Sequence, residues 1–165
     1  MSALDLDFHG CGVRLTGDSG ALLELRRDFA AFDRGAPTVS RGDEIELIRA
    51  APPPGLDAGW TLWSGRNYAV RAAGGERRVL YRDGAAAVFD FSTHSPWARG
   101  RLYCAEPDRL RELGYLAVLS RAGEALDAKG LHRAHALGFE WGGGAGLLFL
   151  PSGGGKSELA LELLR

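Results

Sequence analysis

The residues with the clearest capacity for chemistry in this chain form a glycine-rich run that ends in lysine and serine. The run extends from Pro151 to Glu158 and reads Pro-Ser-Gly-Gly-Gly-Lys-Ser-Glu. Successive main-chain N–H groups of such a loop can point at phosphate oxygens, and the N-terminus of a following helix adds about half a positive charge. The residues predicted to bind phosphate are therefore Ser152, Gly153, Gly154, Gly155, Lys156 and Ser157.

Lys156 and Ser157 have separate predicted roles in this loop. The lysine ammonium would reach the β- and γ-phosphates of a nucleotide, and the serine hydroxyl would hold Mg²⁺. Of 20 basic residues only Lys129 and Lys156 are lysines, and an arginine would present a planar fork instead of a compact charge. The competing interpretation is an ordinary loop in a chain with 24 glycines. Leu150 favours it, because the usual motif has its first glycine at that position.

The stretch from His135 to Leu164 resembles the start of the catalytic domain of HPr kinase/phosphorylase. In that family a histidine and a β-hairpin precede Gly-x-Ser-Gly-x-Gly-Lys-Ser-Glu, and Ala-Leu-Glu-Leu follows. His135 stands at the family's distance before Lys156. The residues that match the motif itself are Ser152, Gly153, Gly155, Lys156, Ser157, Glu158, Ala160, Leu161, Glu162 and Leu163.

The resemblance implies an ATP-dependent protein serine kinase. Lys156, Ser157 and His135 would line its phosphate site, with ATP and Mg²⁺ as cofactors and a serine of a small protein or peptide as the phosphate acceptor. His135 would then be catalytic together with Lys156; taken alone, a strand histidine is equally well explained by hydrogen bonding within the fold. The family's acidic pair, which supplies the base and metal contacts, would lie beyond Arg165. We therefore expect an inactive fragment that binds phosphate without transferring it.

A second class of function stands beside the kinase. In this alternative the chain is a non-catalytic module that binds a partner or peptide, carries a degenerate nucleotide loop, and belongs to a peptide-modification cassette. An acidic pair closely following the last helix would support the kinase, whereas a stop codon there would support the binding module.

The first 130 residues have the patterns of an α+β module with an antiparallel sheet and packed helices. Alternating apolar residues predict strands over 4–8 and 13–15. Asp18 or Ser19 can cap a helix that runs to about Phe32. The further elements predicted are a strand over 44–49, an antiparallel meander over 60–91 with turns at 73–76 and 83–84, a strand over 99–104 and a helix over 107–128.

The last residues predict a second, smaller part. Strands over 135–141 and 146–150 would form a β-hairpin through Gly142, and a helix would open near Gly155. The resemblance implies that this part is the start of an incomplete P-loop kinase domain, made of the hairpin, the phosphate loop and the helix. The predicted division is a module at 1–130 and the kinase segment at 131–165.

Composition excludes several other classes of partner. A net charge of −1 gives no electrostatic reason for nucleic-acid or acidic-membrane binding. No apolar run approaches the roughly 18 residues of a membrane span. With two cysteines and no recognisable leader, the expected location is the cytoplasm, and the oligomeric state stays open, with self-association possible.

Overall fold

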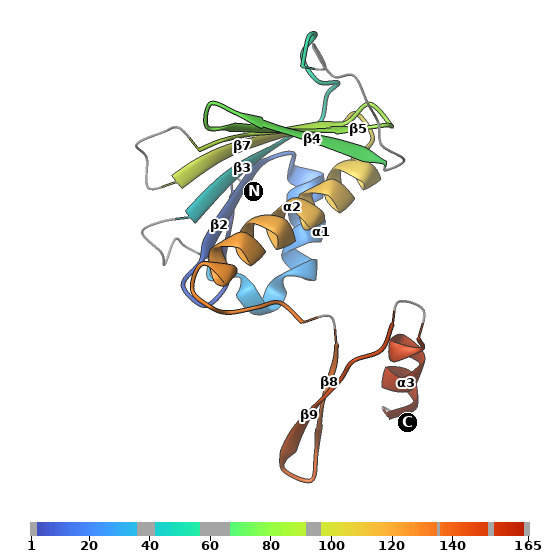
Figure 1. Cartoon of the computed structure of the whole chain (residues 1–165). Helices are drawn as coiled ribbons and strands as arrows, with labels where there is room; N and C mark the ends of the chain where they lie inside the picture. The colour runs from blue at the N-terminus through green and yellow to red at the C-terminus, as the bar shows by residue number, and fades with distance from the viewer. Residues whose placement is uncertain are drawn as a thin grey trace. The chain divides into compact units, whose positions relative to one another are not determined.

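The computed structural model describes residues 3–35, 42–56, 67–91, 97–134, 136–151 and 154–163. The chain divides into two compact units, Met1–Leu131 and His132–Arg165, and each is described by itself (Figure 1). The first unit is an α+β fold with a seven-stranded sheet, and the second holds a two-stranded sheet and a helix. Among the described residues, no helix has both the length and the apolar character needed to cross a membrane.

The first unit opens with a hairpin and a capped helix. Strands β1 (Ala3–Asp7) and β2 (Gly12–Gly17) pair antiparallel, as the alternating apolar residues predict. Helix α1 (Ser19–Asp28) begins where the sequence predicts, because the Asp18 carboxylate accepts a hydrogen bond of 2.9 Å from the N–H of Ala21. The helix ends earlier than expected, and a 3₁₀ turn over Ala30–Phe32 completes the segment.

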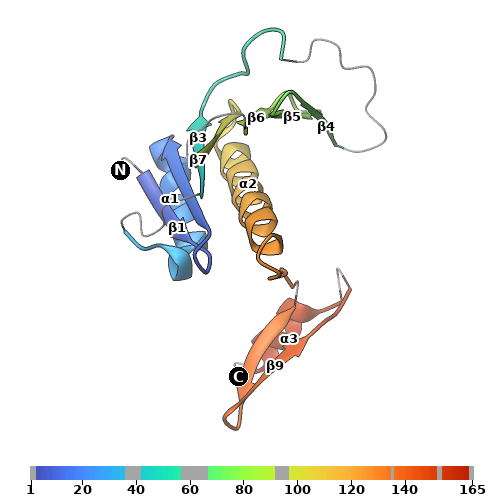
Figure 2. The same ribbon diagram turned by 60° about the vertical axis from the view of Figure 1, so that its left-hand side comes forward.

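The sheet continues through the rest of this unit. Its strand order is β1-β2-β3-β7-β6-β5-β4, and Figure 2 shows β4, β5 and β6 at the end away from β1. The remaining elements of the unit are β3 (Gly42–Ile48), β4 (Tyr68–Ala73), β5 (Glu76–Tyr81), β6 (Ala86–Asp90), β7 (Trp97–Tyr103) and α2 (Pro107–Asp127). The first part of the predicted meander, residues 60–66, lies outside the described residues.

The expectation of a purely antiparallel sheet is wrong for the centre of this unit. Strands β4 to β7 pair antiparallel, but β3 lies parallel to both β2 and β7, so the sheet is mixed. The parallel pairing of β2 with β3 follows from the connection through α1, because a helix that crosses over between two neighbouring strands lets the second strand run in the same direction as the first.

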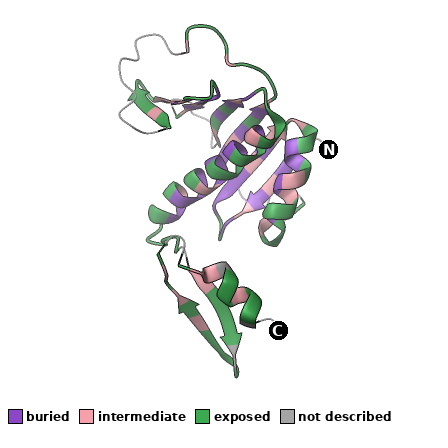
Figure 3. Cartoon of the chain, turned by 90° about the vertical axis from the view of Figure 1, so that its right-hand side faces the viewer, coloured by how far each residue is buried: buried purple, intermediate pink, exposed green. Residues whose placement is uncertain are grey.

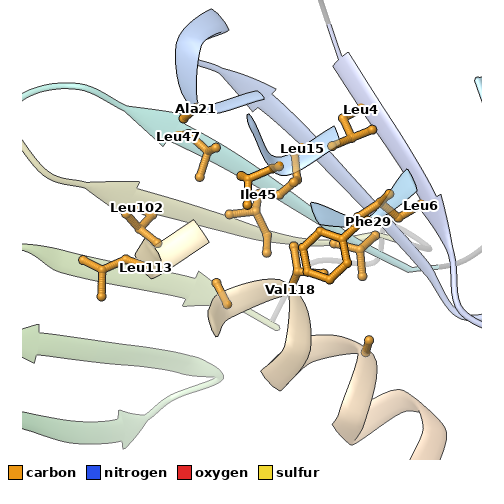
Figure 4. Packing of buried hydrophobic residues seen from close by; sticks show 14 of the residues in the cluster. Leu4, Leu6, Leu15, Ala21, Phe29, Ile45, Leu47, Leu102, Leu113 and Val118 are labelled. Atoms are coloured by element: carbon orange, nitrogen blue, oxygen red, sulfur yellow. The ribbon is translucent and has the colours of Figure 1, made fainter. Parts of the chain in front are cut away.

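The core lies between one face of the sheet and the helices α1 and α2. Figure 1 shows both helices on this face, and Figure 3 shows buried residues concentrated there. Figure 4 shows Leu15 and Ile45 from the strands close to Val118 from α2. The opposite face carries exposed or half-buried ion pairs, such as Arg14 with Asp5. The unit is therefore a two-layer fold with one solvated sheet face. Its least exposed side chains are Leu4, Val13, Leu15, Leu22, Leu25, Ile45, Leu47, Leu102, Leu110, Leu113 and Val118.

Gly100 supports this core through the absence of a side chain. It lies opposite Phe89 across the β6–β7 ladder, and a Cβ at this position would stand 2.6 Å from two atoms of the buried Phe89 ring. We expect Gly100→Ala to lower the free energy of unfolding by about 1–3 kcal/mol, because the ring must leave its packed position. Urea denaturation measures this, with the exposed neighbour Arg99→Ala as control. Equal urea midpoints for both variants would contradict the packing described.

The second unit is a hairpin followed by a helix. Strands β8 (Leu137–Trp141) and β9 (Gly144–Leu148) pair antiparallel, and helix α3 spans Lys156–Leu163. Gly142 and Gly143 form the turn with φ of 60° and 79°, the left-handed conformations that a two-residue hairpin turn requires. None of the described side chains of this unit is buried. Its apolar residues therefore remain largely in solvent.

Candidate functional site

The predicted phosphate loop lies between β9 and α3, and its described part is a tight turn. The N–H of Gly154 donates a hydrogen bond of 3.0 Å to the carbonyl oxygen of Pro151. Gly155 has a φ of 78°, a left-handed conformation that side chains other than glycine's rarely adopt. A Cβ at Gly154 would stand 3.0 Å from the Pro151 oxygen and 3.1 Å from the Cβ of Leu150. Two of the predicted glycines therefore have local reasons to be glycine.

The turn leads directly into the N-terminus of helix α3. The N–H of Leu159 donates to the carbonyl oxygen of Gly155 at 2.9 Å, which is the first bond of the helical ladder. The main-chain N–H groups of Lys156, Ser157 and Glu158 therefore precede the ladder, because the first N–H groups of a helix have no acceptor within it. These groups and the helix dipole favour an anion at this end.

The ammonium group of Lys156 folds back over the start of the loop. Its Nζ donates to the carbonyl oxygen of Leu150 at 2.8 Å and to that of Pro151 at 3.1 Å. The side chain thus closes residues 150–156 into a ring and places the positive charge beside the turn. An ammonium group has three donors, so one is left after these two contacts.

Lys129, which follows α2 in the first unit, makes the same kind of contact. Its Nζ donates to the carbonyl oxygen of Gly10 at 2.9 Å and is 3.4 Å from that of His9, in the turn between β1 and β2. A compact ammonium group can serve two carbonyl oxygens at once, which a planar guanidinium does less readily. The rarity of lysine therefore has a second explanation, in which both lysines brace a tight turn.

The structure brings together only part of the predicted site. Gly154, Gly155 and Lys156 lie in one turn, whereas His135, Ser152 and Gly153 lie outside the described residues. The main chain of Ser157 belongs to α3, and the position of its hydroxyl, the predicted Mg²⁺ ligand, is also outside what the structure describes. Within the described ranges, no group of three or more His, Cys, Asp or Glu side chains could hold a metal ion.

The first unit contains a concave site that sequence reasoning missed. A groove of about 430 Å³ lies where β4, β5 and β6 extend past helix α2. Tyr68, Val70 and Leu116 are exposed along it, and Tyr81 and Phe89 line its deeper part. The alternation of apolar residues in β4 and β5 was a signal for one apolar face. Its meeting with α2 could not be read from spacing, because the lining comes from four separate segments.

A chain of alternating charges closes one side of this groove. Arg121 of α2 is buried and donates to Asp43 of β3 at 2.9 Å and to Glu124 at 2.5 Å. Arg77 of β5 also pairs with Glu124. The Arg121 guanidinium lies over the ring of Phe91, 4.7 Å from its centroid, which adds a cation–π contact.

Burial and pairing act in opposite directions on the carboxyl groups of this chain. Burial raises the pKa of Asp43 above its ordinary value, and the attraction and hydrogen bond of Arg121 only partly offset the effect. Burial would also raise the pKa of Glu124, but the hydrogen bonds from Arg77 and Arg121 outweigh it and lower that pKa. The net result is a raised pKa for the buried carboxyl group and a lowered pKa for the partly exposed one.

The glycine-rich loop is a candidate site on the geometry of its own residues. The described geometry of that loop combines a left-handed glycine, a helix N-terminus and a lysine ammonium beside them. Comparisons of the chain with protein-family models, curated proteins and solved structures find no match.

Proposed function

We propose that residues 150–163 bind the phosphate groups of ATP and that the chain is an HPr-kinase-like ATP-binding protein. In this proposal an α+β module precedes the start of a P-loop kinase domain. The observation that carries it is the junction at Gly155, where a left-handed glycine leads into the first N–H groups of α3 and the ammonium of Lys156 folds back over the carbonyl oxygens at the start of the loop. A helix N-terminus with an adjacent cation is suited to an anion with several oxygens.

A phosphate group would draw the lysine away from its present partners. The carbonyl oxygens of Leu150 and Pro151 are neutral acceptors, whereas a phosphate oxygen carries charge and makes a stronger hydrogen bond with an ammonium group. Lys156 can therefore exchange at least one of these contacts for a phosphate oxygen while its third donor stays available. The main-chain N–H groups of Lys156 and Ser157 would bind the remaining oxygens.

The other predicted residues complete this assignment. Ser152 and Gly153 would supply the first part of the loop, the Ser157 hydroxyl would hold Mg²⁺, and His135 would act near the transferred phosphate. In an active kinase of this class, a bound ATP would supply the phosphoryl group, and a serine of a small protein or peptide would accept it. In such a transfer the protein contributes mainly position and charge, which are the properties of Lys156 and the N–H groups.

The negative charge of Glu158 is unfavourable for binding an anion at the N-terminus of α3. It lies in the first turn of α3, and a Cβ placed on Gly155 would stand 3.4 Å from its Oε2 atom. The carboxylate is stabilised by the helix dipole, but it would repel a phosphate group that approaches the same N–H groups. The side chain is exposed and can turn away, and a divalent cation carried with the nucleotide would reduce the repulsion.

Isothermal titration calorimetry with a series of ligands tests the proposal. We expect the complete chain to bind ATP, ADP and tripolyphosphate in the presence of Mg²⁺, and to bind adenosine at least tenfold more weakly, because the assigned contacts are all to phosphate. Equal affinity for adenosine and ATP would place the nucleotide elsewhere. If none of the phosphate ligands binds, the loop is an ordinary turn.

A further inference from the structure

Strand β4 leaves one row of main-chain groups without a partner strand. It ends the order of the sheet, and within the described residues no strand pairs with its outer side. The N–H of Arg82 donates to the carbonyl oxygen of Asn67 at 3.0 Å, so these opposed residues form a hydrogen-bonded pair. Hydrogen-bonded pairs alternate along antiparallel strands. The N–H and C=O groups of Tyr68, Val70 and Ala72 therefore point away from β5, toward the free edge.

At the opposite edge of the sheet, a segment of the chain lies along the edge strand β1. Along β1, the N–H of Arg34 donates to the carbonyl oxygen of Asp5 at 3.2 Å, and Asp33 forms an antiparallel bridge with Leu6. A short piece of the chain thus covers that edge, which is a common protection against pairing with another chain. The described residues show no such cover on β4.

The two faces of β4 offer different surroundings to an added strand. On the helix side, Tyr68 and Val70 border the groove of about 430 Å³, and their side chains are 42% and 52% exposed. On the other side, Arg71 and Arg78 oppose each other across β4 and β5 and line a hollow of about 250 Å³. Successive side chains of a strand point to opposite faces. An added strand would therefore present alternate residues to an apolar groove and to a basic hollow.

The positive charge of the β4–β5 hairpin favours an added strand that carries acidic residues. Residues 67–82 contain four arginines and one acidic residue, Glu76. Arg77 pairs with Glu124 and Arg78 with Glu76, whereas Arg71 makes no ion pair with any described residue. A second copy of this chain, paired edge to edge, would bring two of these basic hairpins together, which is unfavourable. A partner with carboxylates on one face removes that repulsion.

We propose that the free edge of β4 binds an extended acidic segment of another protein, in which apolar residues alternate with aspartate or glutamate. The segment adds an eighth strand to the sheet through the main chain of Tyr68, Val70 and Ala72. Its apolar residues enter the groove beside Leu116, and its carboxylates lie against Arg71. Main-chain pairing supplies affinity and the two faces supply selectivity. This proposal does not rest on nucleotide binding.

Fluorescence anisotropy with a labelled probe peptide tests the proposal on the complete chain. The probe is Glu-Val-Glu-Phe-Glu-Val-Glu-Ala carrying fluorescein, and two comparison peptides carry lysine in place of glutamate or group the same residues into apolar and acidic halves. We expect the alternating acidic peptide to bind at least tenfold more tightly than either comparison peptide, with an affinity that falls as salt is added. Equal binding of all three peptides, or binding of none, would overturn the proposal.

Variants of β4 locate the binding. Val70→Pro removes an N–H at the free edge without removing a bond to β5, and proline is tolerated at such positions. We expect it to weaken probe binding at least tenfold, while Val70→Ala, which keeps the N–H, weakens it by less. Arg71→Gln, a change at an exposed side chain, should weaken binding severalfold and reduce its salt dependence, and it keeps the test decisive if Val70→Pro unfolds.

Three results contradict the assignment of this edge. Undiminished binding by both Val70→Pro and Arg71→Gln would move the site elsewhere. If sedimentation shows that the wild type is a dimer and that Val70→Pro is a monomer, the edge binds a second copy of this chain instead. A urea midpoint of Arg71→Gln well below that of the wild type would show that the substitution acts on the whole protein and not on the edge alone.

Discussion

Replacing Lys156 with alanine is expected to weaken ATP binding by a factor of about 10–100. The substitution removes the ammonium group that folds back over the start of the loop, and a hydrogen bond to a charged group contributes about 1.5–3 kcal/mol. The main-chain N–H groups remain, so binding is reduced but not abolished. Calorimetry with ATP and Mg²⁺ on the wild type and the variant measures the difference.

Lys129→Ala is the matched control for this experiment. Both lysines donate to a pair of main-chain carbonyl oxygens, so both substitutions release a braced turn and are expected to lower stability to a similar degree. Only the change at Lys156 should lower the affinity for ATP. If the two variants bind ATP as the wild type does, Lys156 is a structural brace like Lys129 and the proposed phosphate site loses its cation.

The fold of the first unit was predictable where the signal is local. Asp18 as a cap, Pro107 at the first position of α2 and the glycines of the hairpin turns are each fixed by backbone chemistry within a few residues. The parallel pairing of β2 with β3 was missed because alternation reveals that a strand exists but not which strand it joins. The order strand, helix, strand in residues 12–48 held that information, since it is the pattern of a parallel crossover.

The candidate site was predictable in the same uneven way. Gly154, Gly155 and Lys156 are neighbours in sequence, so their meeting in one turn needed no knowledge of the fold. The rarity of lysine was a weaker signal than it seemed, because Lys129 shows that a structural role accounts for lysine equally well. The groove beside β4 depends on residues from distant segments, and the burial of Arg121 depends on the approach of β3 to α2. Neither the lining of the groove nor the burial of Arg121 can be predicted from the spacing of residues in the sequence.

The largest expected loss of stability comes from Arg121→Ala. Arg121 and Asp43 have side chains only 9% and 10% exposed, and they are joined at 2.9 Å. Removing the arginine leaves the Asp43 carboxylate buried without its partner, which typically lowers the free energy of unfolding by about 3–5 kcal/mol. Urea denaturation at pH 7 measures this. The double variant Asp43→Val/Arg121→Met removes both charges and is expected to recover most of the loss, so that a double variant as unstable as the single one would contradict the proposed cause.

The dependence of this loss on pH identifies the group responsible. Burial raises the pKa of Asp43 in the folded state, so folding favours the protonated form, and the carboxyl group lowers stability as the pH rises through its folded pKa. Without Arg121 to attract the carboxylate, that pKa rises further. The difference in unfolding free energy between Arg121→Ala and the wild type should therefore shrink as the pH is lowered from 8 toward 5. A difference that stays constant over this range would assign the loss to packing against Phe91, because the cation–π contact does not depend on the protonation of Asp43.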